Sequence, residues 1–206
     1  TSLKVSNGNR NVTVVDKNDI SIAGVTAGQF TLATVGAVTQ TAPITASGIA
    51  VATVAGAVTL TNAGNDVSSL QITSGTQPAS FTDKNAVSLS TIAAGAFTLR
   101  AGGAVTQTQA ATTTSFDVAT TLGGVTLGNA GNALGTLSAN LAATGAALTV
   151  VNNGLLRVAQ VSTQGPIAIS TLNGGNVNIG PAGTPAPKIQ TTSTINFTGV
   201  TGGIVT

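Results

Sequence analysis

Cysteine, methionine, histidine, tryptophan and tyrosine are all absent from this chain of 206 residues, and its five acidic residues are all aspartates. Without cysteine, a disulfide framework, a thiolate zinc site and a redox thiol are excluded. Missing cysteine also suits a chain that is exported unfolded, which favours an extracellular or bacterial cell-surface location. The lack of histidine, cysteine and glutamate removes most acid–base groups and nucleophiles. We therefore expect no enzyme, with no catalytic, cofactor-binding or metal-binding residues and no cofactor.

Charge and aromatic side chains are scarce as well. Charged residues make up 6% of the chain and aromatic residues 2%, all of them phenylalanine. Nucleic-acid binding needs clustered cations or stacking aromatics, and the sequence has neither. No uninterrupted apolar run reaches the length of a membrane-spanning helix, and the first ten residues lack the apolar core of a signal peptide. We expect neither a nucleic-acid partner nor insertion into a membrane.

What the chain does contain is a repeat. GAVTQT occurs at 36–41 and again at 103–108, and VTLTNAGN at 58–65 returns as VTLGNAGN at 125–132. The offset is the same in both pairs (103 − 36 and 125 − 58 both give 67), and a third, eroded copy follows. A fixed period of this kind indicates a repeat architecture. The sequence predicts one segment over 1–206 made of units 1–67, 68–134 and 135–206, an excerpt from a longer chain.

Each unit divides further into short strands. Triplets of alternating apolar and polar residues, such as VSL at 87–89 and FTL at 97–99, recur about every ten residues, with glycine, asparagine and proline between them. Alternation over such lengths indicates strands with one buried face. Glycine and β-branched residues interrupt every window of helical length. We predict an all-β parallel β-solenoid of about nine or ten coils, with three coils of about 22 residues in each 67-residue unit.

Threonines suggest one binding surface. Thr39 and Thr41 are expected to point outward beside Thr59 and Thr61 of the next coil. Rows of Thr-x-Thr on a flat solenoid face are compatible with binding of ice or glycan. The simpler interpretation is that threonine is a good exposed strand residue.

Polar residues near the corners have structural explanations. Gln40 and Gln107 stand where leucines point inward in other coils, and we expect them to close a corner by bonding to turn carbonyls. The NAGN motif at 62–65 and 129–132 is expected to form a tight corner. Calcium at this motif, with Asp66 nearby, is the functional alternative, but one carboxylate rarely makes a site for a hard cation.

Asp16 and Asp83 are the candidates for an enzyme alternative, because several polysaccharide-cleaving enzymes are parallel β-helices with clustered acids. Glycosidic cleavage needs two carboxyl groups about 5 to 10 Å apart. One unit of separation predicts about 14 Å along the axis for three coils. Lys17 and Lys84 follow the two aspartates directly, and the third unit has Val150 at this position. A neutralised surface turn is the favoured interpretation.

The segment PAGTPAPK at 181–188 contains three prolines and interrupts the rhythm. Proline cannot donate to a sheet ladder, so we expect a loop that bulges from the last coils.

The wording of VTQTAPITA at 38–46 and VTLTNAGNDVSSL at 58–70, in a cysteine-free background of Ala, Gly, Thr, Asn and Val, resembles the repeat regions of filamentous-haemagglutinin-like exoproteins. These are large bacterial surface proteins exported by two-partner secretion. The resemblance implies a right-handed parallel β-helix and an extracellular fibre acting in adhesion or display. The secretion motif of that family's amino-terminal domain is absent here.

We therefore expect a structural shaft segment of an adhesin-like protein. Its expected partners are adjoining coils of the same or neighbouring chains, including head-to-tail copies, and a host receptor or glycan. The alternatives are a subunit that assembles end to end into an extracellular filament and a Thr-lined face that binds ice or glycan.

Overall fold

The computed structural model describes residues 1–179, 188–199 and 204–205. These residues form nineteen strands of one continuous sheet and contain no helix. None of the described segments therefore has the long apolar helix that a membrane span would require. The strands are β1 (Ser2–Ser6), β2 (Val12–Val15), β3 (Ile20–Thr34), β4 (Val38–Thr53), β5 (Val58–Leu60), β6 (Asp66–Thr73), β7 (Ala79–Asp83), β8 (Val87–Ala101), β9 (Val105–Gln107), β10 (Ala111–Thr120), β11 (Val125–Leu127), β12 (Ala133–Thr144), β13 (Leu148–Asn153), β14 (Leu156–Gln164), β15 (Ile167–Leu172), β16 (Val177–Ile179), β17 (Lys188–Thr191), β18 (Ile195–Gly199) and β19 (Ile204–Val205).

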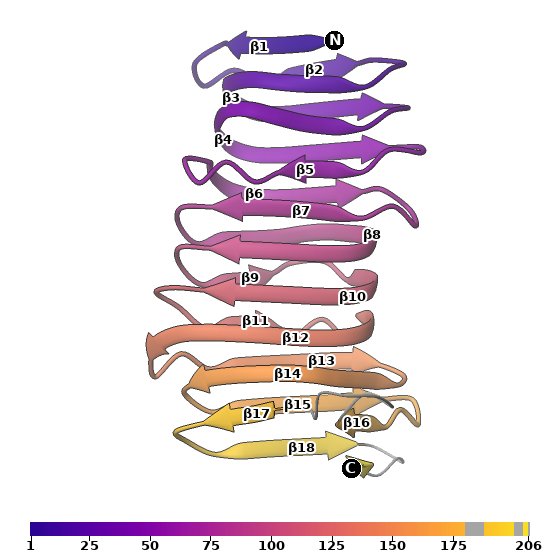
Figure 1. Ribbon diagram of the computed structural model, residues 1–206, viewed down its shortest axis with the longest axis vertical. Helices are drawn as coiled ribbons and strands as arrows, with labels where there is room; N and C mark the ends of the chain where they lie inside the picture. Colours follow the sequence, from indigo (N-terminus) through magenta and orange to yellow (C-terminus); the bar gives the residue numbers. More distant parts are fainter. Residues whose placement is uncertain (180–187, 200–203, 206) are drawn as a thin grey trace.

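The chain winds into a parallel solenoid, as predicted. One column of paired residues runs from Ile20 through Val38, Val58 and Ala79 to Phe97, and every step in it is a parallel pairing. In Figure 1 the strands of the near face run to the left and those of the far face run to the right as the chain descends, which is the right-handed sense. The solenoid has about nine coils, so the predicted fold class is confirmed.

The coils are shorter than predicted. In the column that starts at Ile20, the sequence numbers of successive partners are 20, 38, 58, 79 and 97, so every step is smaller than the predicted 22. Val87, which follows Ile20 by one 67-residue period, belongs to a different column with Val105 and Val125. The 67-residue unit therefore spans three and a half coils, and the prediction of three coils per unit is wrong.

A half-integral winding places equivalent residues on opposite faces. In Figure 1, β7, β8 and β10 end at the left edge, whereas β2, β3, β4 and β6 end at the right edge. The copy of GAVTQT at 36–41 enters β4 on the near face, and the copy at 103–108 enters β9 on the far face. Consecutive units are thus related by a half rotation and a shift along the axis.

Several strands are longer than the predicted triplets. β3, β4 and β8 contain 15, 16 and 15 residues because each continues around one edge, from one face of the solenoid to the other. Gly24, in the middle of β3, has φ of 113°, which lies in the region that favours glycine. It marks the place where the register shifts and the strand bends around the edge. A glycine within a strand can therefore allow the strand to bend, and does not have to end it.

The core is a narrow apolar layer between the two faces. Strand residues alternate between buried and accessible, as in β7, where Ala79, Phe81 and Asp83 point inward. Four phenylalanines are fully buried, and the rings of Phe97 and Phe116 on adjacent coils meet edge to face with centroids 5.2 Å apart. The segment at 181–187 lies outside the described residues, and Lys188 begins β17.

Candidate functional site

The most elaborate polar arrangement is a buried clasp, which we define as Gln40 with Asn65. The Asn65 amide nitrogen donates to the carbonyl oxygens of Leu60 and Thr82, and its oxygen accepts from the backbone N–H of Ile44 at 2.9 Å. Gln40 donates to the same Asn65 oxygen. Asn65 is fully buried, so these bonds satisfy groups that water cannot reach.

The second unit repeats this clasp. Gln107 donates to the oxygen of Asn132, which also accepts from the backbone N–H of Ala111 at 2.8 Å. The Asn132 amide donates to the carbonyl oxygens of Leu127 and Val151. Gln40 also donates to the carbonyl oxygen of Ala42, so the predicted bond to a turn carbonyl is confirmed for Gln40. Gln107 instead bonds to Asn132 and accepts from the backbone N–H of Asn129.

The NAGN motif forms a corner, as predicted, but for a different physical reason. Neither Gly64 nor Gly131 has a positive φ. The corner is instead held by the first asparagine of each motif, because Asn62 accepts from the N–H of Gly64 at 2.8 Å and Asn129 from that of Gly131 at 2.9 Å. Sequence reasoning missed the burial of the last asparagine. Its signal was the constant spacing between glutamine and asparagine, which is the same in both units.

The calcium alternative finds no support in the contacts of Asp66. Its carboxylate lies 3.0 Å from the Lys84 ammonium and accepts from the Asn85 amide at 3.0 Å. The hydrogen bond from Lys84 is the main cause that lowers the pKa of Asp66, and the bond from Asn85 adds to it. Among the described residues, no three metal-binding side chains lie together.

Asp83 is a structural carboxylate rather than a surface residue. It is only 2% exposed and accepts from the backbone N–H groups of Val67 and Asn85, both at 2.8 Å. Burial raises the pKa of Asp83, although both hydrogen bonds act to lower it. The surface-turn interpretation is therefore wrong for Asp83, because its carboxyl group joins one coil to the coil before it.

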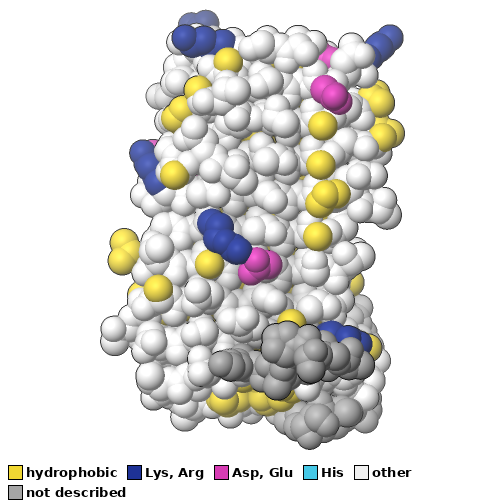
Figure 2. Space-filling view, in the orientation of Figure 1, with side chains coloured by type: hydrophobic (Ala, Val, Ile, Leu, Met, Phe, Trp, Pro, Cys, Tyr) yellow, Lys and Arg dark blue, Asp and Glu magenta, His cyan; other side chains and the backbone are white. Residues whose placement is uncertain are grey.

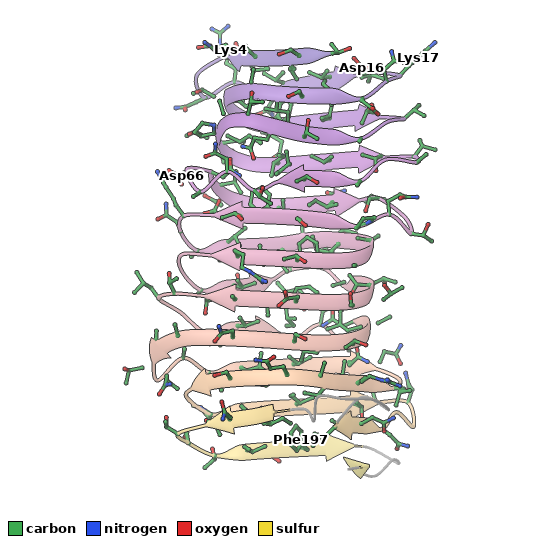
Figure 3. The ribbon with its side chains drawn as sticks, in the orientation of Figure 1. Lys4, Asp16, Lys17, Asp66 and Phe197 are labelled. Carbon is green, nitrogen blue, oxygen red and sulfur yellow. The ribbon has the colours of Figure 1, made fainter. Side chains whose placement is uncertain are left out.

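Asp16 lies far from Asp83. Asp83 ends β7 and Asp16 directly follows β2, and each accepts from the N–H two residues later, Asp16 from Asn18 at 2.7 Å. Three and a half coils separate them by about 17 Å along the axis, and they stand on opposite edges, Asp16 at the right edge in Figure 3. The pair is too far apart for glycosidic acid–base chemistry. In the third unit, Asn152 takes over from Asp83 by accepting from the N–H of Leu134 at 2.7 Å.

The near face carries one column of hydroxyl groups. Ser2 pairs with Ser21 and Ser21 with Thr39, and further down Thr59 pairs with Ser80 and Ser80 with Thr98. Thr39 and Thr41 are exposed, as predicted. Thr41, however, falls where the register with β3 shifts, and it has no paired partner there. Thr61, the next member of the second column, follows the end of β5, and Thr82 pairs with Arg100. In the described strands, regular pairing therefore joins hydroxyl groups of the first column and not those of Thr41 and Thr61.

The fold and these corners define a class of protein, the β-solenoid repeat proteins, in which backbone ladders and buried polar clasps hold stacked coils together. The comparison with family models is specific. The family described as "Repeats of unknown function (DUF5649)" matches residues 9–74 and 76–141, and the two matches together cover well over half of the chain.

The chain therefore belongs to this family of repeats. The matches lie end to end and agree with the first two units of the 67-residue period, displaced by about eight residues. Neither the curated proteins nor the solved structures contain a match to the chain. The family description assigns no activity.

Proposed function

We propose that this chain is a non-catalytic shaft segment of a secreted or cell-surface adhesin-like fibrous protein, in which it provides length. The observation that carries the proposal is the unbroken parallel ladder with one continuous apolar core, because such a structure extends by adding coils. The polar side chains described above are used to hold corners and coils together. The resemblance to filamentous-haemagglutinin-like repeats supports export and display at the cell surface.

End-to-end assembly is a second candidate. The coils stack by pairing one strand edge with the next, as β3 does with β4, and two copies could pair in the same way. Unpaired strand edges are templates for further pairing. Electron microscopy of the isolated chain tests this, since end-to-end assembly predicts filaments of one coil's width and a shaft segment predicts short rods of uniform length.

The shaft proposal is tested on the parent protein by a deletion that respects the winding. Removal of residues 9–75, one full period, joins two equivalent positions and should give a folded, exported fibre that is shorter by about 17 Å. A control deletion of 9–70 removes a similar length out of register and should abolish folding. Surface labelling with antibodies to this chain reads out export. Labelling found only inside cells, or adhesion unaffected by added or removed periods, would contradict the proposal.

A further inference from the structure

Three valines stand out on the surface of the first unit. Val15, Val35 and Val54 are 77%, 45% and 76% exposed, and they lie at the right edge, where β2, β3 and β4 end. Figure 2 shows hydrophobic side chains along the upper part of this edge. Val35 and Val54 lie in one column on neighbouring coils, because Thr34 pairs with Thr53 directly before them. Val15 pairs with Ala33 and lies two residues out of that column on the preceding coil. We name these three side chains the valine ridge.

The fold does not require these valines. One period later the same positions carry Thr82, Gly102 and Thr121, although Leu122, next to Thr121, is itself 80% exposed. The described residues contain only three other large apolar side chains with comparable exposure: Leu122, Leu155 and Ile195. Half of the exposed large apolar residues thus gather on three neighbouring corners, at positions where threonine or glycine suffices.

The corners of the second unit form a hollow instead. A cavity of about 350 Å³ is lined by Thr82, Gly102, Thr121, Ala101, Ala119 and Ala142, among others. The backbone of Gly102 lies close to the preceding coil, because a Cβ atom added there would overlap the carbonyl oxygen of Lys84. Two long cationic side chains at the rim are held by neighbours, Lys84 by Asp66 and Arg100 by Asp117 at 2.6 Å.

The ridge and the hollow face in opposite directions. The hollow lies at the left edge, where β7, β8 and β10 end and where Figure 3 shows Asp66, the partner of Lys84. The ridge lies at the right edge beside Asp16 and Lys17. Both extend over three coils, and corresponding positions are related by the same repeat period.

We propose that the valine ridge of one copy docks into the hollow of a second copy, so that parallel solenoids associate side by side. Two parallel copies that are shifted along the axis by three and a half coils, about 17 Å, bring Val15, Val35 and Val54 level with Thr82, Gly102 and Thr121. The central valine, Val35, then faces Gly102, which has no side chain and lines the cavity. Association removes the three valines from water against a cavity lined mainly by alanine and threonine.

The contact is heterologous, because each copy offers a ridge on one edge and a hollow on the other. Such a contact does not close on itself and builds an open, staggered array of rods. Three coils make a small interface, so the association of isolated segments is weak. This inference goes beyond the shaft proposal, because it concerns how rods pack and not where they are displayed.

Cysteine trapping tests the geometry directly, because the natural chain has no thiol. A Val54→Cys chain mixed with a Thr121→Cys chain should form the mixed disulfide at least about tenfold faster than Val54→Cys mixed with Leu155→Cys. Leu155 is 54% exposed and belongs to neither the ridge nor the hollow, so it controls for random collision. Equal rates for the two mixtures would overturn the proposal.

The second test measures the mass of the assemblies by sedimentation, with two complementary variants. One variant replaces the ridge with the residues that the second unit uses itself (Val15→Thr, Val35→Gly and Val54→Thr). The other fills the hollow with Thr121→Arg. The natural chain should gain mass with concentration, each variant alone should remain monomeric, and an equimolar mixture should stop at dimers. Unchanged circular dichroism establishes that both variants fold.

If the mass of the ridge variant rises with concentration as much as that of the natural chain, the side-by-side contact is overturned. That result would point to end-to-end pairing, which does not use the left and right edges of the solenoid. Failure of the shaft proposal is read separately, from surface labelling of the parent protein. Display on cells without a selective disulfide would support the shaft proposal and overturn the docking of the ridge. A selective disulfide without display on cells would support the docking and overturn the shaft proposal.

Discussion

The first and second units agree closely in the interior and differ at their corners. The hydrogen bonds of Asn65 to the backbone are reproduced by Asn132, although the two clasps lie half a coil apart in rotation. The corners that carry Val35 and Gly102 correspond just as strictly in sequence position, yet one bears an exposed valine and the other a glycine that lines a cavity. Groups that must be satisfied without water are constrained, whereas the solvent-facing tips can diverge.

The largest expected effect comes from breaking the clasps. Asn65→Ala and Asn132→Ala should each lower the free energy of unfolding by about 3 kcal/mol, because each leaves several buried backbone groups without a partner. Urea titration should give the two variants equal losses. A large difference between them would show that the two clasps are equivalent in geometry but not in energy.

The difference between the corners of the two units is tested by substitutions at Val35 and Gly102. Gly102→Ala should cost about 2 kcal/mol, because the added methyl group overlaps the Lys84 carbonyl oxygen. Val35→Ala, at the equivalent corner, should change stability by less than about 0.5 kcal/mol, as expected of an exposed side chain. Gly128→Ala is the matched control for glycine replacement, since nothing lies within 4 Å of its Cβ position. Thermal melts of the three variants suffice.

A smaller effect separates Asp83 from Asn152, which make the same bond to the preceding coil. Because burial raises the pKa of Asp83, the folded state holds this proton more tightly than the unfolded state does. Its contribution to stability therefore falls as the pH rises from the ordinary aspartate value near 3.8 towards the raised one. Asp83→Asn should remove this slope from melting temperatures measured across mildly acidic pH. A slope that persists in the variant would assign it to another group.

The smallest effect is expected at the ion pair of Arg100 and Asp117. Both side chains are 44% exposed, so solvent screens their attraction. Arg100→Ala should cost about 0.5 kcal/mol or less, and this cost should vanish in high salt. A larger loss, insensitive to salt, would indicate that the stem of Arg100 packs at the rim of the hollow.

Much of this architecture could be predicted from the sequence, because the apolar alternation and the repeat are local or periodic signals. The parallel solenoid, the NAGN corner and the corner role of Gln40 all followed from them. The winding number did not, since the repeat period divides about as well into three longer coils as into three and a half shorter ones. Only the pairing of Ile20 with Val38 decides between them.

The candidate sites were harder to predict than the fold. Burial of Asp83 and Asn65 depends on neighbours one coil away, and a single sequence does not say which residue lies there. Asn152 shows the problem clearly, because it replaces Asp83 in the structure at a position shifted by two from the repeat spacing. The valine ridge and the hollow likewise become visible only when the half rotation puts them on opposite edges.

The direction of the backbone ladder has a mechanical consequence. Hydrogen bonds between coils run along the long axis, so a pull on the two ends loads them one coil at a time, as in opening a zipper. Each coil of roughly 20 residues, once released, adds about 60 to 70 Å of extended chain. A rod of this kind yields in small steps under tension and lengthens greatly before it breaks.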